Sequence, residues 1–158
     1  MGIIYPKKSN AARKALIALL LISISPILII AVFLYFLWGA IIYVAIWLTS
    51  RKQFVVFVYS NSPTWKDYIE SEILPYIQDQ AVVLNWSERR NWKNSLAVLA
   101  FRYFGGYRNF NPIGMVFRPF HLVRTYRFFE AFKEFKHGNP KIVEKTKKEL
   151  LEILEFER

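Results

Sequence analysis

An uncharged stretch of 34 residues, Ala15 to Leu48, constrains this chain more than any other feature. A helix needs about 20 apolar residues to cross a bilayer. As one straight helix the stretch would be about 51 Å long, whereas the hydrocarbon core of a bilayer is about 30 Å thick. It also exceeds the apolar region of a cleavable signal peptide, which is about 7–15 residues. We therefore predict an intramembrane helical block over residues 15–50.

The block is too long for one upright span and too short for two full spans. Pro26 and Gly39 are weak points within it, so three arrangements remain: one tilted and kinked span, a shallow hairpin, or a pair of short tilted spans. The positive-inside rule draws basic flanks towards the cytoplasm. Because both flanks are basic, we favour a hairpin or two short spans, with both ends cytoplasmic. These flanking residues are Lys7, Lys8, Arg13 and Lys14 before the block and Arg51 and Lys52 after it.

Residues 51–158, which follow the basic flank 1–14 and the block, suffice for one compact domain. Short β-branched and aromatic runs predict strands, of which the first two resemble strands buried on both faces. Apolar residues at helical spacing predict helices between the strands. We expect strands at 53–60, 81–86, 113–117 and 121–126, a loop at 87–91, and helices at 63–78, 92–104, 128–137 and from Asn139 onward, with Pro75 kinking or ending the first helix.

The predicted order is strand, helix, strand, helix, hairpin, helix, which indicates an α/β domain with a mixed sheet. Ser62-Pro63-Thr64-Trp65 follows the first strand and opens a helix, and Asn111-Pro112 precedes the third strand. In this order the soluble part resembles the thioredoxin-like fold, a β-α-β-α-β-β-α arrangement. That family carries a C-x-x-C motif at the first of these places and a cis-proline at the second.

The chain has no cysteine, and Ser62 and Trp65 stand where the two cysteines of the motif would be. Thiol–disulfide exchange needs a thiolate, so the resemblance does not imply a redox activity. It does imply that free backbone N–H groups of the helix N-terminus could bind an anion or a peptide. This possible site comprises Ser62, Thr64, Trp65 and Pro112. We favour a simpler interpretation, in which Ser62 caps the helix.

No pattern of metal ligands or catalytic residues is present. His121 falls in a predicted strand and His137 near a predicted helix end, and neither has a partner at metal-ligand spacing. We expect no metal and no cofactor. An enzyme acting on a phosphate-bearing or glycan substrate at the membrane would need a general base such as Asp67 or Glu88. The sequence shows no recognisable nucleophile motif or phosphate-binding motif that such an enzyme would carry.

A basic segment free of acidic residues extends from Arg89 to Arg127 in a chain of net charge +10, with aromatic residues interleaved. Arginine suits bidentate phosphate contacts. Nucleic acid is a possible partner, but beside a membrane block anionic lipid headgroups are the simpler one. The predicted anion- or lipid-binding residues are Arg89, Arg90, Lys93, Arg102, Arg108, Arg118, Arg124 and Arg127.

These features predict a non-catalytic, membrane-apposed scaffold or interaction module, because almost no linker separates the block from the first strand. Its basic, aromatic face would bind anionic lipid or an acidic partner protein. Two alternatives are a subunit of a larger membrane complex and the membrane-associated enzyme described above.

Overall fold

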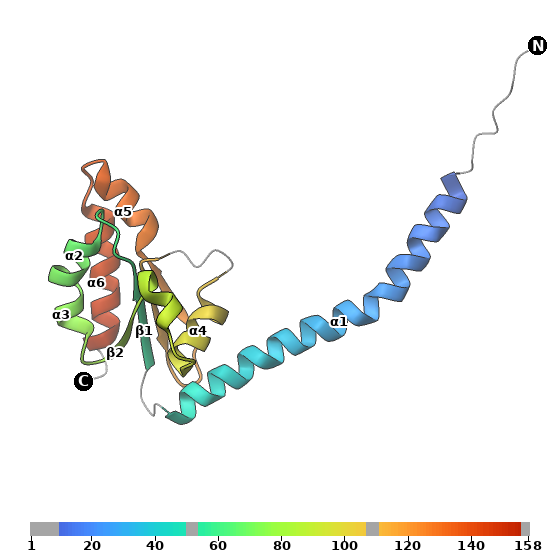
Figure 1. Ribbon diagram of the computed structural model, residues 1–158, viewed down its shortest axis with the longest axis horizontal. Coiled ribbons are helices and arrows are strands. Elements are labelled where there is room, and N and C mark those ends of the chain that lie inside the picture. Colours follow the sequence, from blue (N-terminus) through green and yellow to red (C-terminus); the bar gives the residue numbers. More distant parts are fainter. Residues whose placement is uncertain (1–9, 50–53, 107–110, 156–158) are drawn as a thin grey trace, which may run out of the picture. The chain divides into compact units, whose positions relative to one another are not determined.

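The computed structural model of the protein describes residues 10–49, 54–106 and 111–155 (Figure 1). The basic residues Lys7, Lys8, Arg51, Lys52 and Arg108 lie outside the described residues. The chain forms two compact units, residues 1–38 and residues 39–158. The boundary falls within the first helix, so the C-terminal end of that helix belongs to the second unit.

The apolar block forms one continuous helix, α1, Asn10–Thr49. It is long and apolar enough to cross a membrane. The preferred hairpin and the pair of short spans are therefore wrong, because no turn interrupts the helix. Pro26 cannot donate a hydrogen bond to the carbonyl of Ile22 one turn earlier, but the Ser25 hydroxyl donates to that carbonyl at 3.0 Å. A serine hydroxyl of this kind allows a helix to continue past proline in an apolar medium.

The second unit is built on a mixed four-stranded sheet with the order β2-β1-β3-β4. β1 (Phe54–Tyr59) is parallel to β2 (Ala81–Asn85) and antiparallel to β3 (Ile113–Phe117). β3 forms the predicted hairpin with β4 (Arg124–Arg127). The mixed sheet and the hairpin are confirmed. The Asn111–Pro112 peptide is cis.

The central strands β1 and β3 are buried, whereas β2 and β4 are edge strands. The prediction that the second strand is buried on both faces is therefore wrong: Val82 is 40% exposed. The fourth strand begins at Arg124 instead of His121. Residues 118–123 form the connection between β3 and β4. Its first four residues form a turn, closed by the His121 N–H and the Arg118 carbonyl, and the Tyr43 hydroxyl contacts both of these residues.

The helices follow the predicted order, with local differences. Residues 63–78 contain α2 (Lys66–Glu72) and α3 (Leu74–Ile77), which separate near Pro75 as predicted. The expected loop after β2 is a 3₁₀ helix, η1 (Trp86–Asn91). Trp92 lies outside α4 (Leu96–Phe104), because Ser95 begins that helix by accepting the Val98 N–H at 3.3 Å. The remaining helices are α5 (Phe128–Lys136) and α6 (Lys141–Glu155).

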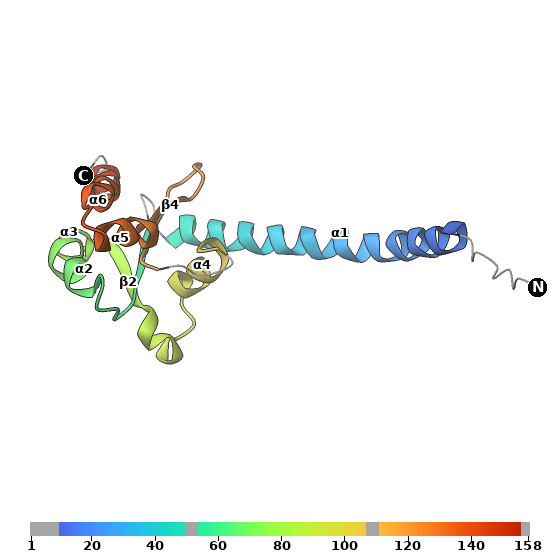
Figure 2. The same ribbon diagram turned by 90° about the horizontal axis from the view of Figure 1, so that it is seen from above.

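Two apolar cores cover the two faces of the sheet, because alternate residues of a strand point to opposite faces. Val55 and Phe57 of β1 pack with α2, α3, α5 and α6 on one face. Val56 and Val58 pack with α4 on the other face, together with Ile42 and Ile46 of α1. Figure 2 shows α4 on one side of the sheet and α2, α3, α5 and α6 on the other.

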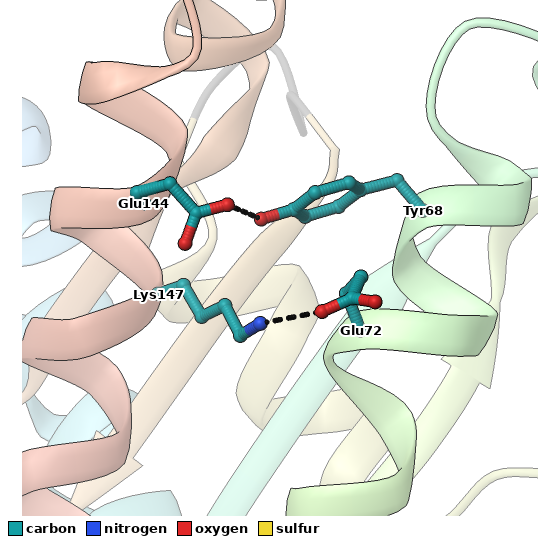
Figure 3. A network of polar contacts seen from close by, with 4 residues as sticks. All are labelled: Tyr68, Glu72, Glu144 and Lys147. Carbon is teal, nitrogen blue, oxygen red and sulfur yellow. Dashed lines mark hydrogen bonds and ion pairs between the residues drawn. The ribbon is translucent and has the colours of Figure 1, made fainter.

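Polar contacts hold α2 against α6 (Figure 3). The Tyr68 hydroxyl donates to Glu144 Oε1 at 2.6 Å, and Lys147 Nζ lies 2.9 Å from Glu72 Oε2. Burial and the hydrogen bond to Glu144 raise the pKa of the Tyr68 hydroxyl. The pair Tyr68–Glu144 therefore favours the neutral phenol in the folded protein.

Candidate membrane-proximal interface

The C-terminal end of α1 belongs to the core of the domain. Ile42 is 2% exposed and Ile46 is 3% exposed, whereas Ile41 beside them is 49% exposed. Residues four apart lie on one face of a helix, so Ile42 and Ile46 present a single apolar edge to the sheet and α4. None of the side chains from residue 13 to residue 38 is buried. Only the last three turns of the apolar helix are therefore part of the domain.

Gly39 begins this packed region. A Cβ atom placed on Gly39 would lie 2.2 Å from Cζ of Tyr103, far inside van der Waals contact. The absence of a side chain therefore lets the ring of Tyr103, in the last turn of α4, lie directly against the backbone of α1. Phe104 packs its ring against Phe117 of β3 at 5.3 Å between centroids. The end of α4 thus joins α1 to the sheet.

The connection between β3 and β4 is fastened to the same end of α1. The Tyr43 hydroxyl contacts the carbonyl oxygens of Arg118 and His121, the latter at 2.8 Å. These two residues also close a turn, in which the His121 N–H donates to the Arg118 carbonyl at 3.3 Å. We call this arrangement the helix–loop junction. A small cleft between its two parts is lined by Tyr43, Ile46, Trp47, Phe117, Arg118 and Pro119.

Two apolar side chains project from the loop of the helix–loop junction. Phe120 is 85% exposed and Leu122 is 92% exposed. The ring of Phe120 meets that of Trp47 edge to face, at 5.2 Å between centroids. Large apolar side chains rarely gather on the surface of a soluble protein unless they meet a partner or a membrane.

The strand register divides the sheet into two ends. Phe54 pairs with Phe117, and Arg124 pairs with Val116, so these residues mark the end beside the helix–loop junction. We call it the proximal edge. Tyr59 pairs with Asn85, and Ile113 pairs with Arg127, at the opposite end. We call that end the distal edge.

The proximal edge carries two of the predicted basic residues, Arg118 and Arg124. Arg124 is exposed at the start of β4, and Arg102 is exposed in the last turn of α4. Arg118 is half-buried and donates from Nη2 to the Ile153 carbonyl at 2.9 Å. That carbonyl belongs to the last turn of α6, where such groups lack helical partners. Arg118 therefore has a structural role at the end of α6.

Four other predicted basic residues lie towards the distal edge. Arg89 and Arg90 belong to η1, and Lys93 follows it. The Arg89 guanidinium lies 5.0 Å from the centroid of the Trp86 ring, and Arg127 pairs with Ile113 in the sheet. The predicted residues are therefore divided between the two ends of the sheet, and their binding of anions or lipid stays a prediction.

The predicted site at Ser62 lies at the distal edge. Ser62 Oγ accepts the Thr64 N–H at 3.4 Å, and its carbonyl accepts the Lys66 N–H at 2.9 Å. Ser62 thus caps a single turn, but Trp65 has a φ of −136°, and the regular helix α2 begins only at Lys66 without a side-chain cap. The expected helix N-terminus at Ser62 is therefore not formed. Pro112 is buried, and its carbonyl accepts the Phe128 N–H at 2.9 Å.

A network of polar side chains occupies the distal edge around Asn85. Asn85 Nδ2 donates to Asn61 Oδ1 at 2.8 Å, and Asn85 Oδ1 accepts the Ser87 N–H at 3.0 Å. Ser87 Oγ in turn accepts the Asn61 N–H at 3.0 Å. These contacts tie the ends of the parallel strands β1 and β2 together. They explain the short polar segments after both strands without a ligand.

The histidines show no metal site. His121 lies in the loop, where Nδ1 is 2.8 Å from the Pro119 carbonyl oxygen, so its predicted place in a strand is wrong. His137 follows α5, as predicted near a helix end. Within the described ranges, no three His, Cys, Asp or Glu side chains converge as metal ligands would.

Sequence reasoning missed the role of Phe120 and Leu122, which it treated as parts of an aromatic segment and a strand. Pro119 is a sequence signal for a turn after the third strand. The exposure of the Phe120 and Leu122 side chains, however, depends on the contacts of the whole helix–loop junction. Comparison of the chain with models of protein families, with curated proteins and with solved structures finds no match.

Proposed function

We propose that this protein is a non-catalytic, single-span membrane protein whose small domain is an interaction module held against the bilayer surface. The observation that carries the proposal is the dual role of α1. Its exposed apolar part is suited to lipid, and its last three turns supply Ile42 and Ile46 to the domain core. A helix that is part of the core cannot act as a loose tether, so the domain stays close to the membrane.

The length of the free part of α1 supports a single span. Residues 15–38 contain no charged side chain and lie outside the domain. A helix of this length extends about 36 Å at 1.5 Å per residue. The hydrocarbon core is about 30 Å thick, and a modest tilt accommodates the difference. Exposed aromatic residues at its domain end, Trp38 and Trp47 among them, suit the headgroup level.

We place the domain on the cytoplasmic side. A single span leaves one of the two basic flanks outside, so the flanks no longer decide the orientation. The exposed arginine of the proximal edge, Arg124, favours a leaflet rich in anionic lipid, which is the cytoplasmic one. The distal basic residues Arg89, Arg90 and Lys93 then point to an acidic partner protein in the cytoplasm.

We further propose that the domain is thioredoxin-like. The support is the succession of β1, two helical segments, β2, α4, the β3–β4 hairpin and the last helices, around a mixed sheet. Because the chain contains no cysteine, such a domain would act by binding and not by thiol–disulfide exchange.

Topology is tested by single-cysteine labelling, since each introduced cysteine reports alone in this cysteine-free chain. Asn10→Cys and Lys141→Cys are treated in intact cells with a membrane-impermeant thiol reagent. The proposal predicts that Asn10→Cys reacts and that Lys141→Cys reacts only after lysis. The opposite pattern would keep the span but reverse the domain. Protection of both sites until lysis would contradict the single span.

Headgroup contact is tested with two matched charge-removing variants. Arg124→Gln alters the proximal edge, and Arg90→Gln removes the same charge at the distal edge. Each basic residue near an anionic leaflet contributes about 1 kcal/mol, or about fivefold in a binding constant. We expect Arg124→Gln to lower the association of spin-labelled phosphatidylglycerol with the reconstituted protein, and Arg90→Gln to leave it unchanged. Equal effects would remove the headgroup role of the proximal edge.

A further inference from the structure

The loop between β3 and β4 has a backbone conformation that its sequence does not favour. Phe120 has a φ of +61°, in the left-handed region that glycine and asparagine usually occupy. It is the third residue of the turn 118–121, in which Pro119 is the second residue and the His121 N–H donates to the Arg118 carbonyl. A type II turn prefers proline at its second position and glycine at its third. A phenylalanine here has a less favourable backbone conformation than glycine.

Burial of the Phe120 ring does not compensate for this unfavourable backbone conformation, because the ring is exposed. Phe120 is 85% exposed, and its described aromatic contact is the edge-to-face one with Trp47. Leu122, two residues later, is 92% exposed. The Tyr43 hydroxyl holds the turn against α1 through the carbonyls of Arg118 and His121. The loop therefore presents two apolar side chains from a fastened turn.

These side chains continue the apolar surface of the membrane helix. Trp47 and Leu48, the last large apolar residues of α1, are 40% and 74% exposed, and Trp47 touches Phe120 directly. Arg124 is exposed where β4 begins. An apolar tip beside aromatic and basic side chains is the composition of a segment that enters the boundary between headgroups and acyl chains.

We propose that the β3–β4 loop is a second membrane-contact element, in which Phe120 and Leu122 insert into the bilayer boundary beside the end of α1. This inference rests on the proposed function, because it requires the domain and the last three turns of α1 to lie at the bilayer surface. Contact at two places, the helix and the loop, would then hold the domain against that surface.

The test uses the full chain in vesicles of equal parts phosphatidylcholine and phosphatidylglycerol. Four single-cysteine variants carry an environment-sensitive fluorophore: Phe120→Cys and Leu122→Cys in the loop, Ile30→Cys in α1, and Asn94→Cys as an exposed control after η1. Lipids with a spin label high on the acyl chain quench fluorophores at the boundary, and lipids labelled near the end of the acyl chain quench the fluorophore at Ile30→Cys within the bilayer. We expect loss of emission and a blue shift at the loop positions, and neither at Asn94→Cys. Ile30→Cys reports insertion of the helix.

The outcomes separate the inference from the proposed function. Quenching at Ile30→Cys without quenching at Phe120→Cys and Leu122→Cys would overturn the loop contact and leave the membrane anchor intact. No quenching at Ile30→Cys would overturn the anchor itself. Loop fluorophores that are shielded from aqueous iodide but not quenched by lipid would indicate that a protein covers the loop, which also overturns the inference. Because Leu122 is almost fully exposed, its variant keeps the folded domain.

Discussion

Replacing Ile46 by alanine tests whether α1 is part of the domain core. Ile46 is 3% exposed and packs in the core on the α4 face of the sheet. The change removes three carbon atoms, which at about 0.8 kcal/mol per buried methylene corresponds to about 2.4 kcal/mol of transfer free energy. The cavity left behind brings typical losses to about 2–5 kcal/mol. In a micelle the undocked helix end meets detergent as well as water, so we expect about 2–3 kcal/mol.

The matched control is Ile41→Ala, which makes the same chemical change five positions earlier on the same helix. Ile41 is 49% exposed, so this variant should change the free energy of unfolding by less than about 0.5 kcal/mol. Because both variants replace isoleucine by alanine within α1, the difference between them isolates the packing of the helix against the domain.

The assay is urea unfolding of the full chain in detergent micelles, followed by tryptophan fluorescence. Denaturant slopes of about 1–3 kcal/mol/M for small domains convert the expected loss into a midpoint lowered by about 0.7–3 M for Ile46→Ala. The midpoint of Ile41→Ala should match that of the parent. Equal midpoints for both variants would refute the claim that the end of α1 belongs to the core, on which the proposed function rests.

Three other predictions concern single contacts of the domain. Tyr43→Phe removes the hydroxyl that holds the loop. Because the hydroxyl has one proton to share between the two carbonyls, we expect a loss of about 0.5–1.5 kcal/mol and faster amide exchange at His121. Gly39→Ala should destabilise the parent, because its Cβ meets the Tyr103 ring. In a Tyr103→Ala background the same change should instead gain up to about 1 kcal/mol of helix propensity, and a double-mutant cycle in urea measures the difference. The raised pKa of Tyr68 stabilises the fold fully below the phenol's ordinary value of 10.0, and this contribution is lost as the pH rises above it. Tyr68→Phe should therefore flatten the fall of the urea midpoint above pH 10; an unchanged slope would show that Tyr68 does not control it.

Local patterns predicted most of the secondary structure of the domain. The alternation of apolar runs with amphipathic helices indicated the order of elements and the mixed sheet. The buried stripe of Ile69, Ile73 and Ile77 follows directly from its spacing. The errors lie where a single tertiary contact overrides a local preference. Trp92 fits the helical pattern of α4, but the Ser95 cap excludes it, and its indole donates instead to the Asn85 carbonyl at 3.1 Å.

The candidate site was less accessible to sequence reasoning. A row of arginines between residues 89 and 127 indicates positive charge, but the strand register determines which end of the sheet each one reaches. Arg118 illustrates the difference, since its guanidinium contacts the end of α6, 35 residues away in the chain. Exposure of Phe120 likewise depends on a turn fastened by Tyr43, 77 residues earlier. Contacts between residues so far apart in the chain produce no periodic pattern in the sequence from which they could be predicted.

Local composition is enough to identify residues 15–48 as an apolar block suited to a membrane, because the absence of charge over that length is visible without the fold. It left the length of the block unexplained: too long for one span and too short for two. The tertiary structure accounts for the excess, because the turns after Gly39 pack Ile42 and Ile46 against the sheet and α4. Lipid and protein core are both apolar, so the sequence pattern is the same in either environment. Only the long-range packing decides where one ends and the other begins.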